Sequence, residues 1–285
     1  MKLILIAFLF STSLCAREYY YSFAKKSEIQ FSEFSDSLLP GAQVVLGEYH
    51  NTAPFQRIEG KIISDLVTYR QIESDFMVAW EFLNYRDTVD IMIHFDDYKS
   101  DHISGDEFIA RLFNGQSTNL PYLDFLSVVK KYAGKLYGVN ALRSIKRTII
   151  ERGLGALDAK DIPPNMQLGN ENYFARFKVS MQDHVPPEQI DAFFLAQSYT
   201  DSVMAYWFQQ WHHYSLNFLI VGAFHSDYQD GVVEQLKKYR GAQTVTVRIV
   251  DLAKLSERAK NEIFVAHEKY GAVADYLYVI DDEEN

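Results

Sequence analysis

The sequence predicts an α/β protein with a mainly parallel central sheet that is flanked by helices and carries a helical insertion. Two observations lead to this prediction. Short apolar runs recur along the chain and end in a glycine or a polar residue, and segments with helical spacing lie between many of them. Strands that alternate with helices are typical of a parallel sheet covered on both faces. In such sheets, ligands bind outside the carboxyl ends of the strands.

The apolar runs are predicted to be buried strands because each is short, apolar and bounded by polar residues. Two of them are followed directly by the same pattern, a glycine and, three residues later, a histidine. In chain order, the predicted strands are residues 43–46, 76–80, 136–139, 218–221, 245–250 and 276–280.

Helices are predicted between these strands. The first begins with Pro54, which suits the first turn of a helix, and it places Phe55, Ile58 and Ile62 at helical spacing. Two further stretches interrupt the alternation and form the predicted insertion. The predicted helices are residues 54–73, 188–213, 228–239 and 253–269, and the interruptions are residues 83–135 and 155–187.

Composition limits the classes of function. The chain has 285 residues, of which 48% are apolar and 23% charged, as is usual for a globular protein. The net charge of −10 disfavours nucleic acid or an anionic membrane face as the main partner, because both need a clustered positive field. The aromatic content of 15% fits either a pocket for a flat apolar ligand or an aromatic core and rim.

The first residues have the pattern of a secretory signal. Lys2 supplies a positive charge, residues 3–10 are apolar but too few to span a bilayer, and small residues then allow cleavage after Ala16. We therefore predict a signal peptide at residues 1–16 and a single α/β domain at residues 17–285. The mature protein is expected in the periplasm or at the cell surface.

Cysteine is found once, at position 15. A lipid anchor on Cys15 is the less favoured prediction, because the bulky Leu14 occupies a position where a small residue is expected. After cleavage, the protein would have no disulfide, thiolate zinc site or cysteine nucleophile.

Two Gly-x-x-His turns, Gly47–His50 and Gly222–His225, are the strongest candidates for a functional site. A glycine after a buried strand lets the chain turn sharply, and the histidine then points across the strand ends. A structural histidine explains one such turn equally well, but two turns after the two most apolar strands favour function. If the strands are parallel, the side chains that follow them lie together at the carboxyl edge of the sheet. These are Glu48, His50, Glu81, Asn140 and His225.

Two chemistries fit these residues. Glu81 ends an apolar run, where a carboxylate is costly to bury unless it is paired, for example with Arg143, or bound to a cation. His50, Glu81 and His225 match the ligand set of a hydrolytic metal centre. Without a metal, His50 would act as a base oriented by Glu48. The serine-hydrolase elbow, the phosphate-binding loop, the dinucleotide fingerprint and the His-Glu-x-x-His motif are absent from the sequence.

The residues resemble the ChaN-type haem-binding uptake proteins, which share a superfamily with the TIKI metalloproteases and the erythromycin esterases. The resemblance begins at Gly47–His50 and ends at Val221–His225. It departs from the family at Asn51, where aspartate is frequent, and at Phe224, where glycine is common. Between its ends, the resemblance includes Gln56, Ala79–Glu81, Asn140–Arg143, Arg152, Gly153, Gln197, Asp201 and Met204.

The resemblance implies an exported α/β protein that binds haem for iron uptake, with uptake partners and a homodimer that sandwiches haem. A tyrosinate can ligate ferric haem in that family, but 19 tyrosines leave its position open. A hydrolase of the same superfamily, His-based or with a divalent metal, is the alternative. The cofactor-binding residues that the resemblance implies are Gly47, Tyr49, Gly222, Asn140 and Arg143.

Overall fold

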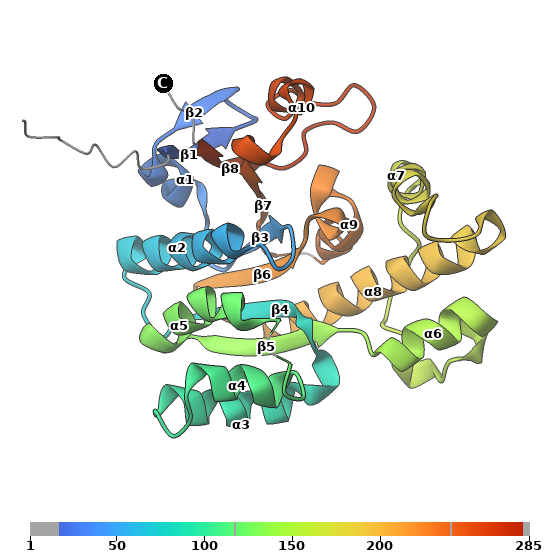
Figure 1. The fold of residues 1–285 in the computed structure, drawn as a ribbon, viewed down its shortest axis with the longest axis horizontal. Coiled ribbons are helices and arrows are strands. Elements are labelled where there is room, and N and C mark those ends of the chain that lie inside the picture. Colours follow the sequence, from blue (N-terminus) through green and yellow to red (C-terminus); the bar gives the residue numbers. More distant parts are fainter. Residues whose placement is uncertain (1–16, 117, 240, 282–285) are drawn as a thin grey trace, which may run out of the picture.

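The computed structural model describes residues 17–116, 118–239 and 241–281. Within them, eight strands form one sheet in the order β2-β1-β8-β7-β3-β6-β4-β5 (Figure 1). The strands are β1 (Arg17–Ser22), β2 (Ser27–Ile29), β3 (Ala42–Glu48), β4 (Phe76–Asn84), β5 (Lys135–Asn140), β6 (Leu216–Gly222), β7 (Thr244–Asp251) and β8 (Tyr276–Asp281).

The sheet is mostly parallel, as predicted, but it is mixed. All pairs from β3 to β8 are parallel, whereas β1 runs antiparallel to both β8 and β2. The six predicted strands are present, and β1 and β2 are additions. Residues 17–22 alternate in burial instead of forming an apolar run, which is the pattern of a half-covered strand near a sheet edge.

Helices cover both faces of the sheet. The predicted helices at residues 54–73 and 188–213 are present, but the two C-terminal ones are shorter than predicted. Tyr228 and Gln229 have positive φ values of 62° and 60°, so a helix cannot begin there. The helices are α1 (Phe31–Ser37), α2 (Ala53–Arg70), α3 (Thr88–Lys99), α4 (Gly105–Leu112), α5 (Leu123–Lys131), α6 (Arg143–Arg152), α7 (Glu171–Met181), α8 (Ile190–Trp211), α9 (Gly231–Leu236) and α10 (Glu257–Glu262).

Alternating side chains of the central strands build two cores. On β3, Val44 and Leu46 belong to the core that α2 and α5 cover. Val45 belongs to the core on the opposite face, with Met204 and Phe208 of α8. Because both faces are buried, every residue of β3 and β6 is buried, and polar groups can reach solvent only at the strand ends.

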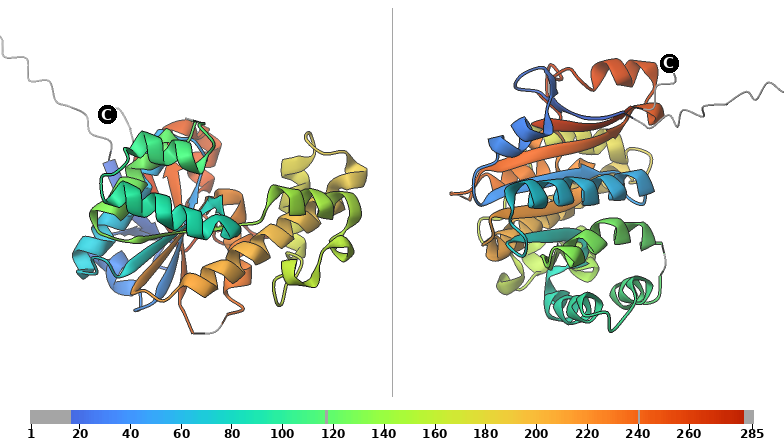
Figure 2. Two further views of the ribbon diagram at one scale, coloured as in Figure 1. Left: turned by 90° about the horizontal axis from the view of Figure 1, so that it is seen from below. Right: turned by 90° about the vertical axis from the view of Figure 1, so that its left-hand side faces the viewer.

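The two interruptions of the pattern are helical. Residues 83–135 contain α3, α4 and α5 beside β4 and β5. Residues 155–187 contain α7, which with α6 and the start of α8 projects from the sheet as an arm (Figure 2). Among the helices described, none is both long and apolar enough to cross a membrane.

Candidate functional site

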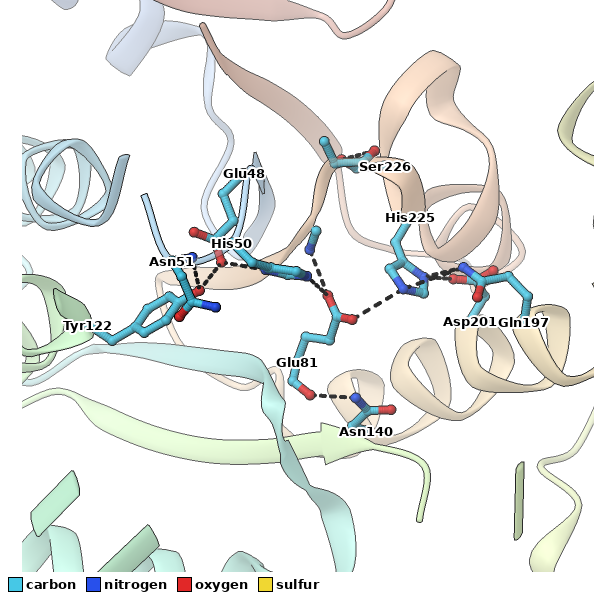
Figure 3. Close-up of polar contacts among 12 residues, drawn as sticks. Glu48, His50, Asn51, Glu81, Tyr122, Asn140, Gln197, Asp201, His225 and Ser226 are labelled. Carbon is cyan, nitrogen blue, oxygen red and sulfur yellow. Dashed lines mark hydrogen bonds and ion pairs between the residues drawn. The ribbon is translucent and has the colours of Figure 1, made fainter. Parts of the chain in front are cut away.

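The polar side chains predicted from the two turns meet at the carboxyl edge of the sheet (Figure 3). β3 and β6 place Glu48 opposite Gly222, and β4 lies on the other side of β6. Glu81 of β4 therefore reaches the turn that follows β6. The structure brings Glu48, His50, Glu81 and His225 into one chain of contacts.

His50 is the accessible member of this chain of contacts. Its Nδ1 donates to Oε1 of Glu48 over 3.0 Å, and its side chain is 37% exposed. The ring lies 4.7 Å from that of Phe82. Burial lowers the pKa of His50, but the hydrogen bond to Glu48 and the charges of Glu81 and Glu48 raise it above its ordinary value. The pair has the arrangement of a histidine base oriented by a carboxylate.

Glu48 is held from several sides. The hydroxyl of Tyr122 donates to its Oε1 over 2.9 Å, and the amide of Gln56 donates to its Oε2. Glu59 is fully buried nearby. Burial, together with the charge of Glu48, raises the pKa of Glu59 well above its ordinary value, so that it keeps its proton. Glu48 is therefore fixed in place as the carboxylate beside His50.

Glu81 lies at the centre of the cluster. Its Oε2 accepts the backbone N–H of Gly222 over 2.6 Å and lies 3.9 Å from Nε2 of His50. Its Oε1 lies 3.2 Å from Nε2 of His225. Burial raises the pKa of Glu81, but His225, His50 and the Gly222 N–H outweigh it and lower the pKa to about 2. Glu81 is therefore ionised, and its partner is His225 and not the arginine considered from the sequence.

His225 lies between two carboxylates. Its Nδ1 is 2.5 Å from Oδ1 of Asp201 on α8, opposite the contact with Glu81. Burial lowers the pKa of His225, but Glu81 and Asp201 raise it to about 10. Asp201 is in turn bound by Tyr173, whose hydroxyl donates to Oδ2 over 3.0 Å. The ring of His225 is therefore a buried imidazolium that joins β4 to α8.

Stability is expected to fall as the pH rises from about 7 towards 10. The pKa of His225 is about 10 in the folded protein against 6.5 ordinarily. Its contribution is thus complete below about pH 6.5 and is lost as the pH rises through the folded pKa. Thermal melts between pH 6 and 9.5 measure the effect. The loss of stability at high pH should be absent in His225→Asn and smaller in Asp201→Asn than in the natural chain. Equal pH dependence of the melting temperature in the natural chain and both variants would contradict this prediction.

The three residues predicted as metal ligands lie around Glu81 but do not form a metal site. Throughout the described ranges, no group of three or more His, Cys, Asp or Glu side chains is arranged to hold a metal ion. Both ring nitrogens of His225 face carboxylates, and those of His50 face Glu48 and Glu81. The set of His50, Glu81 and His225 therefore does not fit a divalent metal in this arrangement.

Both glycines of the turns allow a close side-chain contact. A Cβ atom at Gly222 would lie 2.6 Å from Nε2 of His50, and one at Gly47 would lie 2.5 Å from Oγ of Ser226. Gly47 and Gly222 were predicted to bind a cofactor. In the structure, Gly222 gives room to the ring of His50 and Gly47 gives room to Ser226, and Gly222 also lines a cavity beside His50.

The other predicted cofactor-binding residues lie on two sides of the cluster. Tyr49 is 56% exposed, and its ring lies 4.3 Å from the guanidinium of Arg248. Asn140 donates to the backbone carbonyl of Glu81 over 2.6 Å. Arg143 begins α6 and lines a different cavity from Tyr49. The five residues therefore do not line one common pocket.

The predicted site residues omit three that the structure adds, Tyr122, Gln197 and Asp201. Gln197 lies with its amide nitrogen 3.2 Å from Nδ1 of His225, next to Asp201 on the same helix. The sequence signal for Gln197 and Asp201 was two polar residues on one face of a largely buried helix. A buried aspartate needs a partner, which suggests that it takes part in a site. Tyr122 gives no such signal.

Comparisons with known proteins agree with this fold. The model of the family described as haem-binding uptake, Tiki superfamily, ChaN matches residues 35–236. The structure described as cofacial haem binding to ChaN of Campylobacter jejuni has a TM-score of 0.67 and 18% identity, covering 93% of this chain and 97% of that one. An erythromycin esterase mutant in its open conformation has a TM-score of 0.45 and 12% sequence identity. That match covers 82% of this chain and 77% of the esterase chain. No curated protein matches.

Fold and site together define an α/β protein with a buried histidine–carboxylate cluster at the strand ends of its sheet. The chain belongs to the ChaN family of haem-binding uptake proteins in the Tiki superfamily, because the family model matches well over half of its length. The family resemblance drawn from the sequence is thereby confirmed. The likeness to the Campylobacter jejuni structure shows the shared fold.

Proposed function

We propose that this protein binds haem beside Tyr49 and serves haem or iron uptake as an exported protein. The observation that carries the proposal is an apolar cavity of about 730 Å³ next to Tyr49, in a chain that belongs to a haem-binding family. Cavities of about 300–1,000 Å³ are typical of small-molecule and cofactor sites.

The walls of this cavity fit a flat, apolar macrocycle that carries carboxylates. Leu255, Ile263 and Val265 supply aliphatic surface, and Tyr228 supplies an aromatic ring. Arg258 lies at the cavity with a side chain that is 85% exposed and paired with Glu262 over 2.7 Å, and a propionate would compete with Glu262 for its guanidinium. Haem sites combine such apolar walls with a few polar groups that fix orientation.

Tyr49 is the best-placed iron ligand among the tyrosines that line this cavity. Its hydroxyl has no hydrogen-bond partner in the described part of the chain, whereas its ring is held between Arg248, at 4.3 Å, and Phe55, at 5.8 Å. Tyrosine is an established protein ligand of haem iron, and its anionic oxygen suits Fe(III). Tyr49 would hold the iron, and Arg248 would keep the ring in place.

Hemin titration followed in the Soret band tests the proposal. The natural chain is expected to shift the band at stoichiometric hemin, because the cavity removes the macrocycle from water. Tyr49→Phe removes the ligating oxygen but keeps the ring, so it should change the ferric spectrum and weaken binding by about ten-fold or more, equivalent to about 1.4 kcal/mol.

The matched control is Tyr69→Phe, since Tyr69 is also about half exposed, at 48%, but lies on α2. It should bind hemin like the natural chain. An unchanged Soret band in the natural chain would refute haem binding. A Tyr49→Phe spectrum identical to that of the natural chain would refute the site and leave haem binding in place.

Two further parts of the proposal concern assembly and export. Tyr49, Val179 and Val265 are 56%, 68% and 65% exposed, and the cavity itself is bounded by Tyr49 and Val265. Two copies that close over haem would cover such apolar surface, so sedimentation of the loaded protein should show a dimer. The predicted signal peptide, residues 1–16, lies outside the described residues.

The cluster around His50 also has the form of a general base. His50 and Glu48 face a smaller cavity of about 350 Å³, lined by Phe177, Met181 and Phe224. Hydrolysis without a metal is thus the second function that the residues allow. Membership of a haem-binding family favours haem as the ligand, and haem binding is therefore the function proposed.

A further inference from the structure

A second large cavity lies beside Glu81 and Asn140. It measures about 760 Å³ and is lined by Glu81, Asn84, Asn119, Asn140, Arg143 and Lys146, among others. Unlike the cavity beside Tyr49, its walls are dominated by amides and cations. Glu81 belongs to the histidine cluster and Asn140 bonds its backbone, but neither haem binding nor that cluster uses Asn119, Arg143 or Lys146.

Two cations, Arg143 and Lys146, line this cavity, and neither forms a salt bridge with a described residue. Arg143 forms no salt bridge with any residue that the structure describes, and the contact of Lys146 is with Oδ1 of Asn140, at 3.5 Å. Burial lowers the pKa of Lys146, and Arg143 lowers it further, while Glu81 raises it. In a chain with a net charge of −10, two neighbouring cations left unpaired in one cavity favour an anionic ligand.

Asn119 gives independent evidence for a ligand. It lines the cavity and is only 7% exposed, yet its side-chain amide forms no hydrogen bond with the described residues. No atom of Asn119 is among the enclosed polar atoms that lack a partner, so its amide is open to the cavity. A bound molecule with hydroxyl or carbonyl groups would supply the missing partner.

Glu81 also lines this cavity, and its charge raises the pKa of Lys146. Its carboxylate points to Gly222 and His225, while its backbone carbonyl faces Asn140 (Figure 3). Both carboxylate oxygens are therefore engaged away from Arg143 and Lys146. The lining therefore carries two cations against one carboxylate, and the oxygens of that carboxylate are already hydrogen-bonded or paired.

We propose that this polar cavity binds a small, hydroxyl-rich molecule that carries a phosphate or carboxylate group. Arg143 and Lys146 would hold the anionic group, and Asn119 would bind a hydroxyl or carbonyl group. The size of the cavity suits a ligand of this class. This site is separate from the haem site and does not depend on it.

Calorimetric titration with glucose 6-phosphate, gluconate and glucose tests the proposal on the full-length protein. The two anionic probes should bind and neutral glucose should bind at least about ten-fold more weakly. The stronger anion shows whether phosphate or carboxylate is preferred. Replacing both Arg143 and Lys146 by alanine should lower the affinity for the two anionic probes by about ten-fold or more. Arg147→Ala, an exposed change on the same helix, is the control.

Asn119→Ala separates binding from a structural role. Because the amide has no partner to lose, the melting temperature should stay the same or rise, while probe affinity falls. Absence of binding by both anions, or equal loss in the Arg147→Ala control, would overturn the proposal. Competition between hemin and the anionic probes would also overturn it, because it would place the haem propionates on the same cations. Hemin binding by the natural chain is measured separately, so either proposal can fail alone.

Discussion

Replacing Glu81 by glutamine is expected to lower the free energy of unfolding by about 3 kcal/mol, because removing one partner of a buried ion pair leaves the other charge uncompensated. Two donors depend on Glu81, the Gly222 N–H at 2.6 Å and Nε2 of His225 at 3.2 Å. Glutamine has one oxygen, so its amide NH₂ must face one of these donors. Asp201 remains beside His225 and still compensates part of its charge. The expected loss of stability is therefore at the lower end of the range of about 3–5 kcal/mol for a broken buried ion pair.

Urea denaturation of the natural chain and two variants measures this loss. The control is Glu107→Gln, which breaks an ion pair between Glu107 and Arg111. The side chain of Glu107 is 50% exposed and that of Arg111 is 36% exposed. Such a surface pair contributes less than about 1 kcal/mol. Equal stability of Glu81→Gln and Glu107→Gln would show that the buried contact of Glu81 with His225 contributes nothing.

Alanine is expected to cost very different amounts of stability at two buried glycines. At Gly138 on β5, a Cβ atom would lie 2.2 Å from the backbone oxygen of Asn84, which cannot move without disturbing β4. We expect Gly138→Ala to destabilise the fold by about 2–3 kcal/mol. At Gly222, the Cβ atom would meet the end of the His50 side chain, which can swing towards solvent. The φ of −56° at Gly222 also suits alanine, so the expected stability loss is below about 1 kcal/mol.

Gly222→Ala should act on the site instead. When His50 moves away, it loses the hydrogen bond with Glu48 and the nearby charge of Glu81, which raise its pKa. Titration of the His50 ring by NMR should therefore give a lower pKa in the variant than in the natural chain. An unchanged His50 pKa, or a stability loss as large as that of Gly138→Ala, would contradict this assignment.

The sequence allowed most of the sheet to be predicted because its strands are short, fully buried apolar runs. It also located the edge at which Glu48, Glu81 and the two histidines meet, since glycine turns after parallel strands leave few other places for them. β1 escaped prediction because its residues alternate in burial. α9 was predicted to begin too early because the positive φ of Tyr228 and Gln229 has no clear mark in the sequence. α10 also begins later than predicted, after Ser256, which caps it.

The Gly-x-x-His turns and their carboxylates were thus determined by the sequence alone, because a strand end and its turn are local features. Only the tertiary structure decided what those residues contact. Packing of α8 against the sheet brings Asp201 to His225, which makes the ring an imidazolium between two carboxylates and leaves no metal site. The order of the strands separates Tyr49 from Arg143, because β6 and β4 lie between β3 and β5. Contacts between distant elements depend on how the helices pack against the sheet. That packing cannot be read from a local sequence pattern.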